Sequence, residues 1–408
     1  VSEMELEMTD ALAPEHRARC LNTPFTPLQC YDGYERVRKI TEKLGRTLPG
    51  RYLTSAHPDL VLRAMETGEP YPIRALLVNA TNPLLTYADT HRVYNALMGL
   101  DLLVVLDYYL TPTASIADYV LPVAAAIERP VLQVHGGVAN MGYGGPAAVD
   151  PYYERKTDYD IFRELGMLLG QDDAWPDESL TDAFAAQLAR AGMDWETFCE
   201  CGIYYRPPAY AKHEMLGSDG LPCGFATTTG KIELASEFLP LVGGTRLPNP
   251  VVRETTCSDA LIERVREAGG VHLSMITGSR KQPYNASMYF NNPDFRARSP
   301  YPMAEMSAAT AERLGLSAGD RVEIATDKGS ARFVLGIAAM RDDVLNVDYG
   351  WWHPEWEPGL PHLGGIWESN VNCLTTCQLD EPMIGTWSYN ALDCVLRTID
   401  EPLSWENV

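Results

Sequence analysis

Residues 73–106 read IRALLVNATNPLLTYADTHRVYNALMGLDLLVVL, and this stretch decides the fold. It holds two continuous apolar runs, at 73–79 and 102–106, with a loop marked by Asn82-Pro83 and a helical pattern over 89–97 between them. A strand, a helix and a strand at this spacing form a βαβ unit. Strands that are apolar on both faces predict a parallel sheet that is covered on both sides.

The rest of the chain predicts a second, β-rich region. Residues 322–335 alternate around an Asp-Lys-Gly turn, which is the signature of a β-hairpin, and we expect a small closed barrel in the last third. The proline-rich stretch 171–250 predicts a long linker between two lobes. The glycine-rich stretch 136–145 lacks the Lys-Ser/Thr of a P-loop, so a mobile surface loop is favoured there over a phosphate site. We expect helices over 34–44, 59–67, 158–169 and 303–314, and strands over 119–123, 271–276 and 344–347.

Composition excludes several classes of function. The 408 residues carry 33 Lys and Arg against 55 Asp and Glu, a net charge of −22, which disfavours a protein that coats nucleic acid. No apolar run reaches the ~18 residues that a membrane helix needs. The N-terminus is acidic where a signal peptide would be basic, so we expect a cytoplasmic protein.

The cysteines and histidines predict no metal site. The nine cysteines are scattered and form no CxxC or longer cluster, so neither a disulfide framework nor an iron–sulfur cluster is expected within this chain. His353 has no second histidine at zinc-ligand spacing, and His135 and His272 are interpreted as ordinary half-buried side chains. No HExxH motif is present. The sequence therefore shows no complete catalytic machine of its own.

Three groups of polar or aromatic residues are candidate sites. Asp107 and Thr111 follow one strand of the βαβ unit and Asn82 follows the other, at the edge where open α/β sheets bind ligands. Their side chains suit a ribose or a guanine edge, or else they cap the next helix, and spacing alone leaves both open. Thr277-Gly-Ser-Arg280 is predicted to form a turn after a strand. Its arginine could bind a phosphate or a carboxylate, but such a turn is more often structural than a binding site. The aromatic stretch Trp351-Trp352-His353-Pro-Glu-Trp356 could form the wall of a substrate cleft. Alternatively it packs as a cap over the barrel, and this second interpretation is favoured.

Several segments, in one order, carry a resemblance to a known family. The chain resembles the C-terminal part of the molybdopterin oxidoreductases (the dimethyl-sulfoxide-reductase family). The expected fold is then a partial parallel-sheet α/β lobe followed by a six-stranded double-psi-type β-barrel. The expected domains are 1–170, 171–265 as connection, and 266–408. The segments are VNATNP at 78–83, DYYLTPTASIADYVLP at 107–122, FATTTGKIE at 225–233, TGSR at 277–280, GWW at 350–352 and ESNVNCLT at 368–375.

The resemblance implies a bis-pyranopterin guanine dinucleotide cofactor that carries Mo or W. It places one nucleotide end on Asn82, Asp107 and Thr111, with Thr113 beside them. It implies no metal ligand from this chain, and it puts any 4Fe-4S cluster in the missing N-terminal part or in a partner. The pterin and phosphates would be lined by residues of the last domain, namely Thr277, Gly278, Ser279, Arg280, Gln282, Tyr284 and Asn370, and Trp352 is a further expected cofactor-binding residue.

Two departures from the family pattern matter. The glycine expected before Asn-Pro is replaced, the sequence running Ala80-Thr81. The family's N-terminal portion, with its cysteine cluster and metal ligand, is absent, and the chain begins abruptly with Val1. We therefore expect one half of a catalytic unit. The other half would come from a partner polypeptide or was lost by truncation, and an iron–sulfur electron-transfer subunit is a further expected partner.

Three functions remain open on the sequence. The leading one is an oxidoreductase component in which the metal performs the redox step. The second is a hydratase or hydroxytransferase that uses the same cofactor as a Lewis acid. The third is a cofactor-binding module without turnover. The substrate is not readable from this chain.

Overall fold

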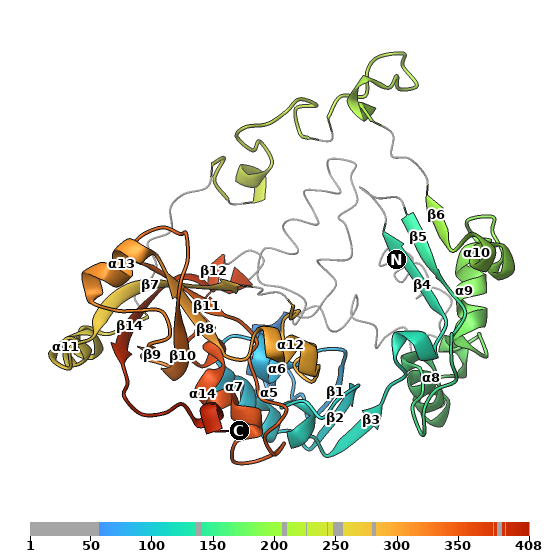
Figure 1. The fold of residues 1–408 in the computed structure, drawn as a ribbon. Coiled ribbons are helices and arrows are strands. Elements are labelled where there is room, and N and C mark those ends of the chain that lie inside the picture. The colour runs from blue at the N-terminus through green and yellow to red at the C-terminus, as the bar shows by residue number, and fades with distance from the viewer. Residues whose placement is uncertain are drawn as a thin grey trace. The chain divides into compact units, whose positions relative to one another are not determined.

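The computed structural model describes residues 57–135, 141–205, 210–225, 227–242, 244–247, 256–279, 283–377, 379–381, 386–387 and 389–407. They form two compact units (Figure 1). The barrel unit comprises the described residues of 57–121 and 256–407, and the second unit those of 122–247. The predicted helix 34–44 lies outside the described residues. Residues 57–121 belong to the same compact unit as the barrel. The domain boundaries expected from the sequence stay a prediction.

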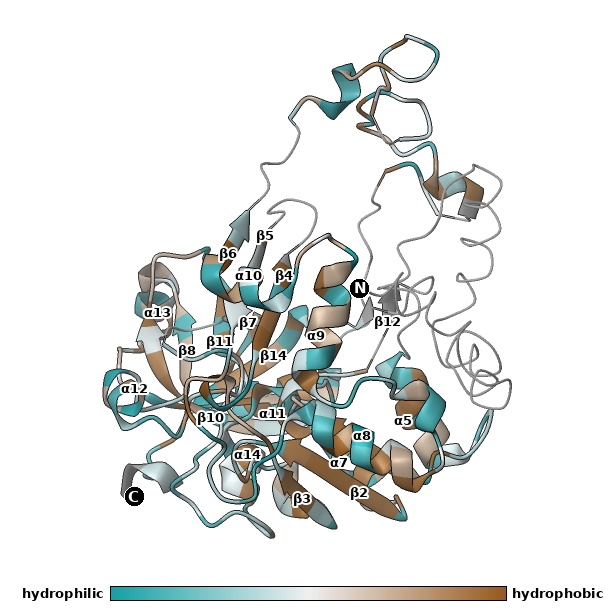
Figure 2. Ribbon diagram, turned by 90° about the vertical axis from the view of Figure 1, so that its right-hand side faces the viewer, coloured by the Kyte–Doolittle hydropathy of each residue, from teal (hydrophilic) through white to brown (hydrophobic). Residues whose placement is uncertain are grey.

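The βαβ unit forms as the apolar runs predict. Strands β1 (Ala75–Asn79) and β2 (Leu102–Asp107) pair in parallel, and β3 (Tyr119–Pro122) completes a three-stranded sheet in the order β1-β2-β3. β2 is strongly hydrophobic (Figure 2). β1 pairs only with β2 among the described strands, and Leu77 on β1 is exposed, so the expected cover on both faces is incomplete here. The helices of this layer are α5 (Pro58–Thr67), α6 (Pro83–Thr86) and α7 (Thr90–Met98).

The last third closes into the expected six-stranded barrel. The strand order is β10-β8-β11-β7-β14-β9, and the predicted hairpin is the antiparallel pair β9–β10. Alternate residues of these strands, such as Val322 and Ile324, are fully buried and fill the interior. The strands are β7 (Val271–Ser279), β8 (Met303–Met306), β9 (Arg321–Thr326), β10 (Gly329–Ile337), β11 (Val344–Asp348) and β14 (Asn390–Thr398).

Shorter elements complete the barrel unit, and none of the described helices is both long and apolar enough to cross a membrane. Helix α11 contacts β7 and β14. These elements are α11 (Asp259–Glu267), α12 (Pro293–Arg298), α13 (Ala308–Leu314), α14 (Ile366–Ser369), β12 (Leu379–Glu381) and β13 (Thr386–Trp387).

The second unit corrects two predictions. Residues 171–250 were expected to form a linker, yet they contain two helices and a strand, because Ser179 and Asp194 cap the two helices. Residues 141–145 of the predicted glycine-rich loop form a strand that pairs with its neighbours on both sides. The elements are β4 (Val131–His135), β5 (Met141–Gly145), α8 (Asp158–Leu168), α9 (Leu180–Ala189), α10 (Trp195–Cys201) and β6 (Ile203–Tyr205).

Two further predictions fail at element boundaries. The helix expected over 303–314 begins only at Ala308, because Ser307 caps it and residues 303–306 alternate in burial as strand β8. The turn expected at Thr277 is absent, since β7 continues through Ser279. In both places pairing with a barrel strand overrides the local pattern.

Buried asparagines join the barrel to the parallel-sheet layer. Asn370 Nδ2 donates to the carbonyl oxygen of Leu84 at 3.0 Å and to Thr90 Oγ1 at 3.1 Å. Asn372 Nδ2 donates to the carbonyl oxygen of Leu85 at 2.7 Å. Both asparagines are fully buried. Side chains that follow the barrel strands therefore hold the turn of α6 in place.

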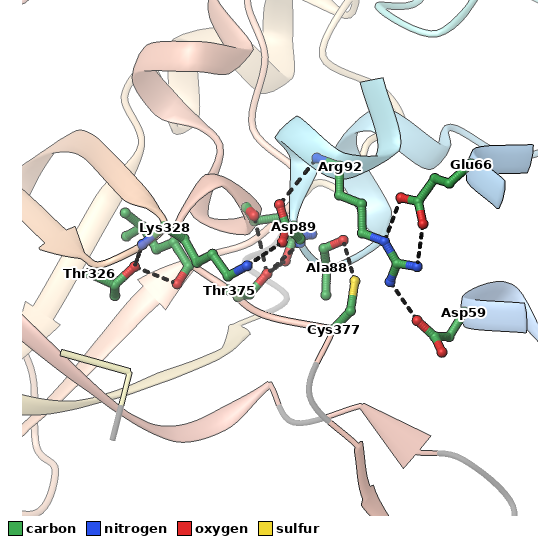
Figure 3. Close-up of polar contacts among 11 residues, drawn as sticks. Asp59, Glu66, Ala88, Asp89, Arg92, Thr326, Lys328, Thr375 and Cys377 are labelled. Carbon is green, nitrogen blue, oxygen red and sulfur yellow. Dashed lines mark hydrogen bonds and ion pairs between the residues drawn. The ribbon is translucent and has the colours of Figure 1, made fainter. Parts of the chain in front are cut away.

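Asp89 makes the second junction (Figure 3). Its backbone N–H donates to Thr375 Oγ1 at 3.2 Å, and its carboxylate accepts from Lys328 Nζ at 2.8 Å. The same carboxylate caps α7 by accepting from the backbone N–H of Arg92. The Arg92 guanidinium in turn donates to Glu66 on α5 at 2.7 Å. Asp89 therefore connects Lys328 in the β9–β10 turn to α7, and Arg92 connects α7 to α5.

The Asn372→Ala variant tests the first junction. Removing the carboxamide leaves the buried carbonyl of Leu85 without its donor, which costs about 1–3 kcal/mol. We expect the free energy of unfolding, measured by urea denaturation, to fall by that amount. The control is Asn95→Ala on the exposed face of α7, which we expect to cause no loss. Equal effects of the two substitutions would contradict the junction.

Candidate functional site

A cavity of about 220 Å³ opens beyond the carboxyl ends of β1 and β2. Because the two strands are parallel, their ends meet at one edge of the sheet, with Asn79 opposite Leu106. The loop after each strand contributes to the wall, and a segment that follows β7 contributes the opposite side. The lining residues are Ala80, Thr81, Asn82, Asp107, Tyr108, Tyr109, Thr111, Ser287, Met288, Tyr289, Asn291 and Trp352.

Asn82 brings an unused hydrogen-bond donor to this cavity. Its Oδ1 accepts a hydrogen bond from Thr113 Oγ1 at 2.6 Å, and Thr113 Oγ1 accepts from the N–H of Leu84. These bonds fix the orientation of the carboxamide. Its Nδ2 is buried and has no acceptor among the described residues. A buried donor without a partner costs about 1–3 kcal/mol, so a ligand with an acceptor atom is favoured here.

Asp107 brings a desolvated carboxylate to the same cavity. One oxygen accepts from the N–H of Tyr108 at 2.7 Å, and the other lies 3.3 Å from Thr111 Oγ1. Burial raises the pKa of Asp107 above its ordinary value, against the opposing effect of these hydrogen bonds. Relative to the unfolded chain the fold therefore disfavours the charge of this carboxylate, and this destabilisation develops as the pH rises through the raised pKa. N–H donors of a ligand would offset that cost.

Thr111 bonds both to the following turn and to Asp107. Its Oγ1 accepts from the N–H of Ala114, the first residue of the short 3-10 helix Ala114–Ile116, and lies 3.3 Å from the Asp107 carboxylate. The N-cap residue of that helix is Thr113, whose side chain makes no capping hydrogen bond. Thr111 is buried and lines the cavity, and its role toward a ligand stays a prediction.

Aromatic side chains form the rest of the wall. Trp352 is held by a hydrogen bond from its Nε1 to the carbonyl oxygen of Ser287 at 3.0 Å. Tyr108, Tyr109 and Tyr289 are partly exposed at the cavity. A cavity with aromatic faces, one carboxylate and one amide donor fits a planar base that carries both N–H donors and acceptors. The ribose or guanine edge expected from the sequence stays a prediction for this wall.

The backbone at Ala80 is strained. Ala80 has φ 54°, in the left-handed region that residues with a Cβ avoid at a cost of about 1–2 kcal/mol. It occupies the position where the family pattern has glycine. Ala80 therefore has the left-handed backbone conformation that glycine adopts easily. We infer that alanine at this position raises the conformational energy of the turn without changing its path.

A second cavity, of about 420 Å³, lies at the end of β7. Thr277 and Gly278 line it together with an aromatic set, and Thr277 Oγ1 donates to the carbonyl oxygen of Tyr389 at 2.7 Å. Trp387 Nε1 is buried without an acceptor among the described residues. The aromatic side chains are Tyr87, Tyr349, Trp387 and Tyr389.

Other predicted site residues are placed differently. Tyr284 donates its hydroxyl to the carbonyl oxygen of Ser299, and the carboxamide of Asn370 is bonded within the junction described above, so both serve the protein's own packing. Arg280, Gln282 and the side chain of Ser279 lie outside the described residues. The pterin contacts assigned to all of them stay a prediction.

The tryptophan-rich stretch packs elsewhere than expected. Trp351 and Trp352 belong to the core of the parallel-sheet layer, with Leu84 and Val105, and not to the barrel core. His353 is fully buried between the rings of Trp356 and Trp405. Burial lowers the pKa of His353. The stretch therefore anchors Trp352 at the cavity, and only that residue of the stretch lines it.

Sequence reasoning missed the segment 287–291, whose residues form one side of the first cavity. No motif marks this segment, because its position depends on the path of the chain after β7. Among the described residues, no group of three His, Cys, Asp or Glu side chains could hold a metal ion.

Comparisons with known proteins give a consistent picture. Two family models match the chain: molybdopterin oxidoreductase over residues 42–167 and molydopterin dinucleotide binding domain over residues 273–392. Acetylene hydratase of Syntrophotalea acetylenica is 30% identical over 370 residues, which are 88% of this chain and 48% of that enzyme. The dimethyl sulfoxide/trimethylamine N-oxide reductase of Rhodobacter capsulatus is 27% identical over 305 residues, 68% of this chain and 36% of that enzyme.

A solved structure extends the likeness to the fold. Acetylene hydratase from Pelobacter acetylenicus superimposes with a TM-score of 0.73 at 26% identity, covering 94% of this chain and 52% of that one. The chain thus spans about half the length of this relative, and less than half of the two enzymes above.

The Ala80→Gly variant tests the strained turn. Glycine tolerates φ 54°, so we expect the unfolding free energy to rise by about 1 kcal/mol, measured by urea denaturation. Ala309→Gly on the exposed side of α13 is the control, where the same change should destabilise. A loss of stability in Ala80→Gly would show that the turn is not strained.

Proposed function

This chain belongs to the molybdopterin oxidoreductase family, and we propose that it binds the guanine dinucleotide end of a bis-pyranopterin cofactor in the cavity at the ends of β1 and β2. The observation that supports this most directly is the buried Nδ2 of Asn82, which has no acceptor among the described residues and lines the same cavity as the desolvated carboxylate of Asp107. One wall then offers a donor and an acceptor to the same ligand. This combination suits a guanine nucleotide better than a purely anionic or apolar ligand.

Each residue of the wall would have a separate role. The Asp107 carboxylate would accept from two adjacent N–H groups of the base, and Asn82 would donate to an oxygen of the nucleotide. Thr111 would hold the Asp107 carboxylate in orientation, as its 3.3 Å contact already does. Trp352 and Tyr289 would exclude water from the base. When bound, the cofactor supplies a Mo or W ion for redox or Lewis-acid chemistry.

The second cavity is proposed to take the ring and phosphate part of the same cofactor. Its aromatic lining and its Trp387 Nε1 donor, which has no acceptor among the described residues, fit a flat, acceptor-rich group. Thr277 and Gly278, which the sequence resemblance assigns to this role, lie in its wall. Arg280 and Gln282 would extend this site.

The complete catalytic unit is proposed to include a further half outside these 408 residues. The known relatives are about twice as long as the matched part, and Leu77 leaves an apolar side chain of β1 exposed at the sheet edge. That half would supply the metal's protein ligand and any 4Fe-4S cluster. An iron–sulfur electron-transfer subunit is the additional partner proposed for a redox member.

A cytoplasmic location is part of the proposal. Seven cysteines of the described region, among them Cys257, Cys373 and Cys394, are free thiols. Burial raises the pKa of Cys257 and of Cys373 to about 12, so these thiols stay protonated and unreactive. Such thiols suit a reducing compartment.

Two reaction classes are proposed for the complete unit. An oxidoreductase is favoured by the family and by the similarity to the dimethyl sulfoxide/trimethylamine N-oxide reductase. A hydratase is the second candidate. The observation in its favour is that acetylene hydratase matches 88% of this chain, a wider match than the 68% of the reductase.

Nucleotide release tests the binding proposal. We expect acid treatment of the purified protein to release GMP together with Mo or W, measured by chromatography and elemental analysis. In Asp107→Asn the retained GMP should fall at least 10-fold, since a hydrogen bond to a charged group contributes about 1.5–3 kcal/mol. Asp101→Asn is the control, because Asp101 forms an exposed ion pair with Arg74 just before the start of β2. A wild-type protein without GMP and without metal would favour the non-catalytic module.

A reaction screen separates the two classes. For an oxidoreductase we expect the native holoenzyme to turn over only when an electron donor or acceptor is supplied. For a hydratase we expect water addition to an unsaturated substrate with no net consumption of the electron carrier. Turnover in the absence of any carrier would contradict the oxidoreductase proposal.

A further inference from the structure

Tyr289 lines the first cavity with a strained backbone. Its φ is 72°, in the left-handed region, which is an outlier for a residue with a bulky side chain. Backbone hydrogen bonds of 3.0 Å hold the turn on both sides: Met288 N–H donates to the carbonyl oxygen of Asn285. Asn292 N–H donates to the carbonyl oxygen of Tyr289 itself. Glycine would adopt this φ without strain, so the tyrosine is costly here unless its side chain serves a purpose.

The protein's own packing uses only part of the Tyr289 ring. The ring meets Phe295 of α12 in an edge-to-face contact, with the two centroids 6.0 Å apart and the planes at 79°. This contact fixes the direction of the ring. Tyr289 nevertheless remains 46% exposed at the cavity. A fixed aromatic ring with free surface is therefore available to a ligand.

The other aromatic residues of this wall are less suited to cover a planar base. Trp352 is only 4% exposed, so the protein already covers its ring. Tyr108 and Tyr109 are about as exposed as Tyr289, but neither ring contacts another ring in the part of the chain that the structure describes. A ring that is held in place before binding loses less conformational entropy than one that is free to turn. Tyr289 is thus the ring best prepared for a base.

We propose that Tyr289 stacks on the guanine base of the nucleotide. This inference rests on the proposed function and adds a contact residue to the same cavity. Asp107 and Asn82 would bind polar atoms at the edges of the ligand, which leaves the faces of the base to be covered. Stacking on an aromatic side chain supplies that cover and adds to binding independently of the hydrogen bonds at the edges.

Substitutions at position 289 separate the ring from the backbone. Tyr289→Ala and Tyr289→Gly both remove the ring, but only glycine also relieves the strained φ. We expect both variants, purified as holoprotein from the native locus, to release at least about 5-fold less GMP per chain on acid treatment, the lower end of a base–aromatic stack. The glycine variant should nevertheless unfold at a higher urea concentration than the alanine variant. Tyr289→Phe keeps the aromatic face and should retain GMP.

Tyr153→Ala is the matched control. Tyr153 is a second tyrosine in the left-handed region, with φ 53°, but it lines neither of the two cavities. We expect this variant to release as much GMP as the wild type.

Several outcomes would overturn the proposal. Full GMP release from Tyr289→Ala or Tyr289→Gly would show that the ring does not contact the base. Loss of GMP from Tyr289→Phe would assign the role to the hydroxyl group, and a larger loss in Tyr109→Ala than in Tyr289→Ala would place the stack on the strand-end loop. Each of these results leaves GMP binding by the wild type intact. Absence of GMP from the wild type would instead reject the proposed function, and the stacking role with it.

Discussion

The structure depends on two buried carboxamides that follow the barrel strands and bind the parallel-sheet layer. Asn370 and Asn372 donate to the carbonyl oxygens of Leu84 and Leu85, which a helix as short as α6 leaves without a full set of intrahelical partners. Because these carbonyls are buried, no water can replace the asparagines, and the barrel must stay docked for the layer to keep its turn. Asp89 strengthens the same junction through Lys328 and Thr375.

This constraint decides what the strand ends can offer to a ligand. Asn82 immediately precedes α6, and its Oδ1 accepts from Thr113, while its Nδ2 has no acceptor within the part of the chain that the structure describes. Across the gap, Asp107 is held by Tyr108 and Thr111 in a position where burial disfavours its charge. Trp352, which follows the barrel strand β11 in the sequence, also lines this wall. The cavity is therefore assembled by the docking of two regions that are distant in sequence, and it is set up before any ligand arrives.

Individual strands could be predicted from the sequence where a single pattern of apolar residues was sufficient. Continuous apolar runs gave β1 and β2, and alternation around Asp-Lys-Gly gave the β9–β10 hairpin. The rule failed where barrel pairing competed with local periodicity, as in residues 303–306, and where caps such as Ser179 begin helices inside a proline-rich stretch. The cavity residues at 287–291 carry no local pattern at all, so no reading of the sequence could have placed them.

The sequence by itself determined the family, the βαβ unit, the closed barrel and the strand-end residues Asn82 and Asp107, because periodicity and motif order are written along the chain. Only the tertiary structure decided which polar atoms remain free. Asn370 and Asn82 look equally suited to a ligand in the sequence. The carboxamide of Asn370 is bonded within the junction, whereas the Nδ2 donor of Asn82 finds no acceptor among the residues described. The partner of the Asn370 carboxamide, Thr90, lies about 280 residues away in the sequence, and the partner of Asn82, Thr113, lies about 30 residues away. No local sequence pattern can reveal such hydrogen bonds.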